Sequence, residues 1–387
     1  MAIENPALQM LGIRRLKLPS RNWMIFWTVV SAVGGGVAYD KYQQSVLRTQ
    51  YMEKAKYLGE RPFQPNELPR KLRIYVAPPP NDFLSEGLKY LRRFCKPILN
   101  SASIDFDIYT AERQGDIRHA VAEEIRQLRR AAVAKPEQPS AANGASEDPE
   151  ETKPLKELYQ PSDVLGISKC IKPQPLVFED ANVPPEQAGG IITIGRGAYK
   201  EYINGVHEGL LGPLEKPEKP EQEKKEAFPE ENQSAEDTEP KKEAPPVIDS
   251  YVDTKLYSSL PLAPELDINN LRDANGVPFF FTQPVLPLQN YNVAGFTKQP
   301  ERLYRFYTKR HQLVEYNEQL WGLITKNSRP FTESDLGLLQ DEENDWPKRF
   351  VKESREKGTE WTQPFVGDPR VLELLRVYEK PSDVNSA

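Results

Sequence analysis

The feature that most constrains this chain is an uncharged run near its N-terminus, from Trp23 to Tyr39 (WMIFWTVVSAVGGGVAY). At about 1.5 Å per residue the run covers roughly 26 Å, against a hydrocarbon core of about 30 Å, and polar neighbours can snorkel to the headgroups. We therefore predict a transmembrane helix over residues 23–39. Its glycines, Gly34, Gly35 and Gly36, weaken a soluble helix but suit close helix packing in a membrane, so they are candidate contacts with another span.

Basic residues before the run set its expected orientation. They outnumber the single acidic residue Glu4, and they are Arg14, Arg15, Lys17 and Arg21. The positive-inside rule keeps residues 1–22 on the side of synthesis, or in the matrix for a mitochondrial protein, and places the bulk opposite. Two alternatives stay open: a signal peptide cleaved near Ala38, and a buried core helix.

Composition separates folded from low-complexity segments. The 387 residues include 36 prolines and 28% charged residues, and the mean hydropathy is −0.66. Proline- and glutamate-rich stretches at 135–155 and 213–246 are typical of a disordered insertion and a solvated linker. The net charge of −6 argues against a nucleic-acid partner. A sequon at Asn232 leaves open passage through the endoplasmic reticulum, where it would be glycosylated.

Between these segments the hydrophobic pattern alternates between strand and helix. Residues 72–76 and 104–108 have the period of two expected of strands, and the unbroken apolar run 191–194 is typical of a strand buried on both faces. Helical patterns follow each strand, the first with Asn81 as its expected N-cap, so an α/β fold with a parallel sheet is predicted. The expected organisation is a basic N-terminus (1–22), a transmembrane helix (23–39), a stalk (40–69), an α/β domain (70–212), a linker (213–246) and a mostly helical C-terminal segment (247–380) that could complete the same domain.

The C-terminal segment carries clear helix signals. A long helix is predicted from Pro300 to about Thr325, a capping box at Thr332 to Asp335, and a last helix that starts at Asp368-Pro369 and continues through Tyr378.

Polar residues suggest few sites. Cys95 and Cys170, the only cysteines, form no metal motif, and no metal site or cofactor is predicted; whether the two pair stays open. We expect the three histidines, His119, His207 and His311, to be solvated. Two basic clusters are predicted to be polar helix faces, the second a candidate contact for acidic lipid or an acidic partner: Arg126, Arg129 and Arg130, and then Arg302, Arg305, Lys309 and Arg310.

One strand-to-helix turn could bind a phosphate. Its backbone N–H groups would point from a helix N-terminus at the end of a buried strand. The element order resembles the nucleotide domain of diacylglycerol and sphingolipid kinases, whose turn reads Gly-Gly-Asp-Gly-Thr with a following Glu. The matching positions here are Ile194, Gly195, Arg196, Gly197, Ala198 and Glu201. The turn has lost its Asp and Thr, so the resemblance implies a kinase-like fold without catalysis.

Three stretches carry a closer resemblance: NPALQMLGIRRLKLPSRNWMIFWTV, RKLRIYVAPPPNDFLSEGLKYLRRFCKPIL and GIITIGRGAYKEYINGVHEGLLGPL. They are similar to the fungal fifty-four-kilodalton subunit family of the mitochondrial inner-membrane translocase that inserts carrier proteins. The resemblance implies a non-enzymatic scaffold in the inner membrane with its bulk in the intermembrane space. Its implied partners are the channel subunit and the small chaperones that carry precursors. The alternative is a membrane-anchored nucleotide- or lipid-phosphate-binding protein, with Arg196 as an anion contact.

Overall fold

A computed structural model describes residues 2–3, 16–17, 20–63, 67–134, 177–215 and 250–381, apart from single gaps at 269, 274 and 294. The described chain centres on a six-stranded sheet with the order β5-β4-β7-β8-β10-β9. Its strands are β4 (Lys71–Val76), β5 (Asp105–Thr110), β7 (Ile191–Ile194), β8 (Val285–Leu288), β9 (Ser328–Pro330) and β10 (Arg376–Tyr378). All neighbouring pairs are parallel except β9 and β10. The predicted α/β class and mostly parallel sheet are therefore confirmed.

The central strands show why the sequence folds this way. All four residues of β7 and of β8 are buried, as expected for strands covered by helices on both faces. The edge strand β5 is largely exposed, and it alternates apolar with charged residues. Strands from the first and last thirds of the chain thus share one sheet.

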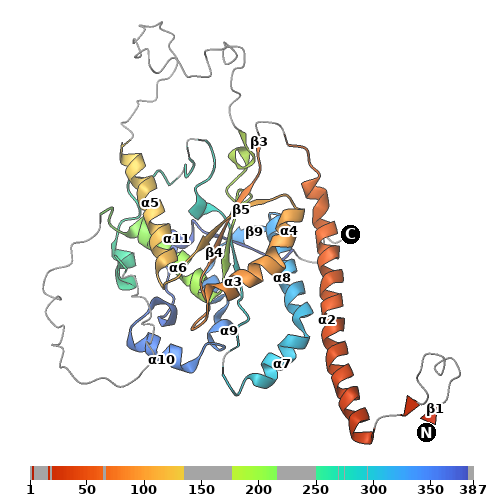
Figure 1. The fold of residues 1–387 in the computed structure, drawn as a ribbon. Helices are drawn as coiled ribbons and strands as arrows, with labels where there is room; N and C mark the ends of the chain where they lie inside the picture. The colour runs from red at the N-terminus through yellow and green to blue at the C-terminus, as the bar shows by residue number, and fades with distance from the viewer. Residues whose placement is uncertain are drawn as a thin grey trace, which may run out of the picture.

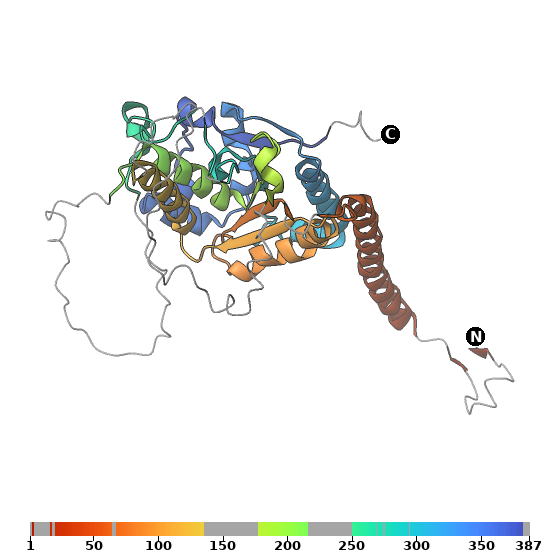
Figure 2. The ribbon, with the colours of Figure 1, turned by 90° about the horizontal axis from the view of Figure 1, so that it is seen from above.

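Helices form a layer on each side of the sheet (Figures 1 and 2). One layer consists of α5 (Asp116–Ala134) and α6 (Arg196–Leu211), covered by the short elements of the C-terminal region. The other contains α3 (Leu84–Tyr90), the π-helical turn η1 (Leu91–Cys95), α4 (Lys96–Ser101) and α8 (Lys309–Ile324). Each layer has its own hydrophobic core, one centred on Tyr199 and Tyr202, the other on Leu99 and Leu320.

A single helix, α2 (Arg21–Gly59), contains both the predicted span and the residues after it. Its C-terminal half packs against α4 and α8, and Ala55 is fully buried there. Among the described residues no helix is both long enough and apolar enough to cross a membrane, and the span over residues 23–39 stays a prediction. The uncharged run is short, is bounded by Asn22 and Asp40, and is diluted by three consecutive glycines.

Three predicted helices have different bounds in the structure. The helix after β4 starts at Leu84 rather than beside Asn81, which has a left-handed φ of 59° and therefore sits in the preceding turn. The expected helix 300–325 is two helices, α7 (Gln299–Tyr307) and α8, separated at Thr308, whose φ of −121° breaks the helical geometry. The last helix, α11 (Pro369–Leu372), ends early, because the chain turns to enter the sheet as β10.

The remaining described elements are short. The predicted capping box at Thr332 is confirmed, at the start of the 3-10 helix η8 (Glu333–Gly337). Two helices, α9 (Gln340–Glu343) and α10 (Lys348–Glu356), and the 3-10 turn η9 (Glu360–Thr362) follow it. Two-residue strands form two further pairs, β1 (Ala2–Ile3) with β2 (Leu16–Lys17), and β3 (Glu67–Leu68) with β6 (Val177–Phe178). The predicted insertion, almost all of the predicted linker, and Arg14, Arg15, Cys170 and Asn232 lie outside the described residues.

Candidate functional site

The predicted phosphate-binding turn is formed as expected between β7 and α6. Gly195 links them with a φ of 92°, a conformation that favours glycine, and serves as the N-cap of α6. The turn lies at the carboxyl end of the central strand, where parallel sheets commonly bind ligands. Free backbone N–H groups at this position would make an anion site.

A carboxylate of the protein itself occupies that anion position. Glu342, from α9, accepts hydrogen bonds through Oε2 from the backbone N–H groups of Arg196 and Asn290, both at 3.0 Å. The Glu342 side chain is almost completely buried, and burial raises its pKa to about 7. Two of the backbone N–H donors at this strand end, those of Arg196 and Asn290, are therefore already paired within the chain.

Arg196 is also fully engaged. Its guanidinium donates to the carbonyl oxygens of Leu336 and Leu338 at 2.7 and 2.6 Å, and its Nε lies 2.9 Å from Oε1 of Glu343. Lys200, one turn further along α6, lies 2.8 Å from the same Glu343 oxygen. Arg196 thus holds α9 against α6 and is not aimed at a ligand.

The Trp361 ring packs against the turn at Gly197. A Cβ added to Gly197 would lie 2.6 Å from the Trp361 ring, so this glycine is required for the close approach of η9. The cavity that remains between the Pro78–Pro80 segment, the turn and Trp361 has a volume of about 10 Å³. That volume is the minimum for one water molecule, whereas ligand sites generally measure hundreds of cubic ångströms.

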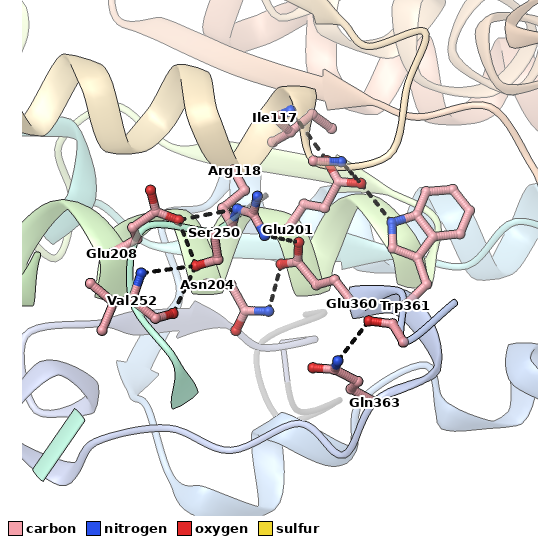
Figure 3. A network of polar contacts seen from close by, with 12 residues as sticks. Ile117, Arg118, Glu201, Asn204, Glu208, Ser250, Val252, Glu360, Trp361 and Gln363 are labelled. Atoms are coloured by element: carbon pink, nitrogen blue, oxygen red, sulfur yellow. Dashed lines mark hydrogen bonds and ion pairs between the residues drawn. The ribbon is translucent and has the colours of Figure 1, made fainter. Parts of the chain in front are cut away.

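Glu201 has a structural role at the N-terminus of α5. Its carboxylate accepts the backbone N–H groups of Gly115 and Ile117 at 2.9 and 3.1 Å, and the indole N–H of Trp361 at 2.6 Å (Figure 3). Burial and the nearby Glu360 carboxylate raise the pKa of Glu201 above its usual range. Glu201 therefore holds α5, α6 and η9 together.

A buried charge network continues along the interface between α5 and α6 (Figure 3). Glu208 of α6 lies 3.1 Å from Nε of Arg118 and 2.6 Å from Nη2 of Arg126, and all three side chains are at most 7% exposed. Arg118 also reaches Glu360 at 2.9 Å, and Asn204 donates to the same carboxylate at 2.6 Å. Through Glu360, these contacts join α5 and α6 to η9.

Two predictions about polar residues on these helices are wrong. Arg126 and Arg129 were expected on a solvated face but are buried, because Glu208 and Glu265 pair with them and Tyr251 stacks over the Arg126 guanidinium, 4.4 Å from the ring centroid. His207 was also expected in solvent and is fully buried. The covering residues lie far along the sequence, so no local pattern indicates them.

The His207 imidazole is held neutral by its contacts. Its Nδ1 lies 2.8 Å from the carbonyl oxygen of Ile203, and its Nε2 accepts the backbone N–H of Asp368 at 3.0 Å. The ring stacks on Tyr257 with centroids 5.1 Å apart. Burial lowers the pKa of His207 to about 4.

Acid destabilisation through His207 is a testable consequence. An unfolded histidine binds a proton below about pH 6.5 while the folded one does not until about pH 4, so its contribution to stability is lost as the pH falls through that window. We expect His207 to account for a loss of about 3 kcal/mol at full effect. Urea unfolding of the detergent-solubilised chain at pH 7 and pH 4.5 should show a smaller acid loss for His207→Gln than for the unsubstituted protein. Equal losses would contradict the assignment.

The glycines of α2 and Cys95, also singled out from the sequence, have the following surroundings in the structure. Gly34 and Gly35 have no atom within 4 Å of an added Cβ, whereas Gly36 faces the Tyr307 ring at 3.4 Å. Cys95 is buried, and burial raises the pKa of its thiol to about 12. In the described part of the chain no group of three or more metal-ligating side chains is assembled.

No sequence pattern predicted the residues that close the turn. Glu342, Glu343 and Trp361 lie about 140 to 165 positions after the glycines they cover, in short elements with no recognisable motif. The one usable signal was the glycine at position 197, which indicates a close approach without naming the partner.

Fold and site together define an α/β domain: a mostly parallel sheet whose strand-end turn is covered by its own C-terminal region and which follows a long N-terminal helix. The family model described as "Inner membrane protein import complex subunit Tim54" matches residues 5–243 and 221–378. The chain belongs to the Tim54 family. The predicted family and the predicted role as a subunit of the mitochondrial inner-membrane translocase are thereby confirmed.

Similar proteins come from several fungi, and each is named mitochondrial import inner membrane translocase subunit TIM54. The Candida albicans protein is 44% identical, with 97% of this chain and 96% of that protein aligned. The Saccharomyces cerevisiae protein is 36% identical over 97% and 94% of the two chains. The Neurospora crassa protein is 30% identical over 96% and 80%.

Proposed function

We propose that this chain is a non-enzymatic docking subunit of the translocase that inserts multi-spanning carrier proteins into the mitochondrial inner membrane. The observation that carries the proposal is Glu342, which accepts the backbone N–H groups of Arg196 and Asn290 at the strand-end turn where a phosphate would bind. With this turn occupied by its own side chains, the domain would offer its outer surface to partners. The proposed partners are the channel subunit and the small chaperones that deliver precursors.

The proposed arrangement puts the folded domain in the intermembrane space. The first part of α2 attaches the domain to the inner membrane, since its apolar side chains, among them Trp23, Ile25 and Trp27, are more than half exposed in the isolated chain. Contact with membrane helices of other subunits would cover this surface. The location of residues 1–22 in the matrix stays a prediction from the basic residues alone.

Crosslinking in mitochondria tests both the role and the location. After rupture of the outer membrane, a membrane-impermeant lysine crosslinker should join the folded domain to small intermembrane-space proteins and leave the channel subunit co-purifying with the chain. Gly35→Leu adds bulk to a bare stretch of α2 and should reduce recovery of the channel subunit severalfold. Val33→Leu, at a position already 49% exposed and apolar, is the matched control and should change little.

Two results would overturn the proposal. Crosslinks that form only after the inner membrane is opened would place the domain in the matrix. Equal recovery of the channel subunit with Gly35→Leu and Val33→Leu would exclude the glycine stretch as a contact.

A further inference from the structure

Helix α2 leaves the folded domain at a defined point. Gly36 faces Tyr307 of α7, and the buried Asp40 lies 3.7 Å from the guanidinium of Arg310, at the start of α8. Before this point α2 projects alone (Figure 1). Residues 21–35 extend roughly 22 Å beyond the domain. If this projecting part enters the membrane, the elements around its exit lie at the membrane surface.

The element at this exit is α7, which has an unusual surface. None of its residues is buried, and it exposes Leu303, Tyr304 and Phe306 by 60%, 66% and 47%. Phe296, just before the helix, is 90% exposed. A short helix with exposed aromatic and basic residues is typical of an element that lies in a lipid interface.

A basic cavity opens between α7–α8 and α3–η1. It has a volume of about 220 Å³, and its charged lining residues comprise one acid and five bases, which are Glu86, Lys89, Arg93, Arg302, Arg305 and Lys309. Within this cavity Lys89 pairs with Glu86 at 3.0 Å.

Among the described residues, two of the five bases, Lys89 and Arg305, form ion pairs, and the other three do not. Arg305 pairs with Glu301 and Asp345 from outside the cavity, at 2.5 and 3.2 Å. In the described part of the chain, Arg93, Arg302 and Lys309 have no carboxylate within ion-pair distance. Burial and the neighbouring cations Arg93 and Lys89 lower the pKa of Lys309. The cavity thus holds excess positive charge that an anion would compensate.

We propose that this cavity binds the phosphate-bearing headgroup of an acidic phospholipid while α7 lies on the membrane surface. The inference rests on the membrane attachment proposed above. A lipid fits better than an acidic peptide because the basic residues stand beside exposed Phe306 and Leu303, which can contact acyl chains, and beside the exit of the apolar part of α2. Headgroup and chains would then be bound by neighbouring surfaces.

Titration with short-chain lipids tests the headgroup site. The full chain in a neutral detergent is titrated with dihexanoyl phosphatidylglycerol, dihexanoyl phosphatidylcholine and inorganic phosphate, and binding is followed by thermophoresis. We expect phosphatidylglycerol to bind at least tenfold more tightly than the other two. Arg302→Gln combined with Lys309→Gln should weaken that binding roughly thirtyfold, since each basic residue near an anionic surface contributes about a five- to sixfold factor. Arg349→Gln with Lys352→Gln, an equal charge change on α10, should leave it unchanged.

Equal binding of the two lipids, or equal loss in the two double variants, would overturn the proposal. Binding of inorganic phosphate as tight as that of phosphatidylglycerol would replace the lipid by a free anion. Flotation with phosphatidylcholine vesicles separates the two inferences. A chain that floats but shows no headgroup preference contradicts only the cavity proposal, whereas a chain that does not float contradicts the membrane attachment.

Discussion

Glu208→Ala is expected to lower the free energy of unfolding by about 3 kcal/mol, because it removes the buried carboxylate shared by two buried guanidinium groups and leaves Arg118 with Glu360 and Arg126 with the partly exposed Glu123. Arg118 and Arg126 contact Glu208 at 3.1 and 2.6 Å, and Ser250 donates a further hydrogen bond to it at 3.0 Å. Urea unfolding of the detergent-solubilised chain, followed by tryptophan fluorescence, measures the loss.

The matched control is Glu123→Ala on the outer side of α5. Glu123 contacts Arg126 and Arg130 at 3.6 and 2.7 Å but is one-third exposed, so its loss should cost less than about 1 kcal/mol. Equal losses for the two variants would show that the buried network does not stabilise the domain. Adding Arg126→Met to Glu208→Ala should recover part of the loss, since an apolar side chain leaves no unpaired charge.

Gly205→Leu is the second change with a large expected effect. A Cβ at this position would lie 2.8 Å from the backbone oxygen of Arg118 and 2.9 Å from Cβ of Val121, so the neighbouring helix cannot yield by rotating a side chain. The two helices must separate, which also breaks the ion pairs of Glu208. We expect a loss of more than about 3 kcal/mol, at the upper end of what overpacking costs.

Gly34→Leu provides the same substitution without the contact. No atom lies within 4 Å of an added Cβ there, and leucine favours a helix more than glycine does. The measured stability of Gly34→Leu should therefore equal or slightly exceed that of the unsubstituted chain. A loss at Gly205 no larger than the change at Gly34 would mean that α5 and α6 are not in close contact.

The sequence predicted the elements that depend on local pattern. The period of two gave β4 and β5, the unbroken apolar run gave β7, and the Asp368-Pro369 signal gave the start of α11. It did not predict that α6 is buried on every side, including Lys200 and His207. Polar residues on a helix normally indicate solvent, and only the covering C-terminal region reverses that expectation.

The position of the candidate site was predicted from the sequence, but its closure by other side chains was not. The turn at Gly195 was identified by two glycines after a buried strand, and it lies at the sheet edge as expected. Its closure by Glu342 and Trp361 depends on tertiary contacts between segments about 145 to 165 residues apart. The break between α7 and α8 was missed because no proline or glycine stands near Thr308, where the break occurs.

We propose that the strand-end turn, closed by the protein's own side chains, serves docking and not phosphate transfer. Thermal unfolding of the detergent-solubilised full chain with and without ATP and Mg²⁺ tests this directly. Glu342 and Trp361 occupy the turn, so we expect the same Tm at every nucleotide concentration and no phosphate transfer to diacylglycerol. A saturable rise in Tm would contradict the claim, because a ligand at 100 times its Kd stabilises the folded state by about 2.7 kcal/mol.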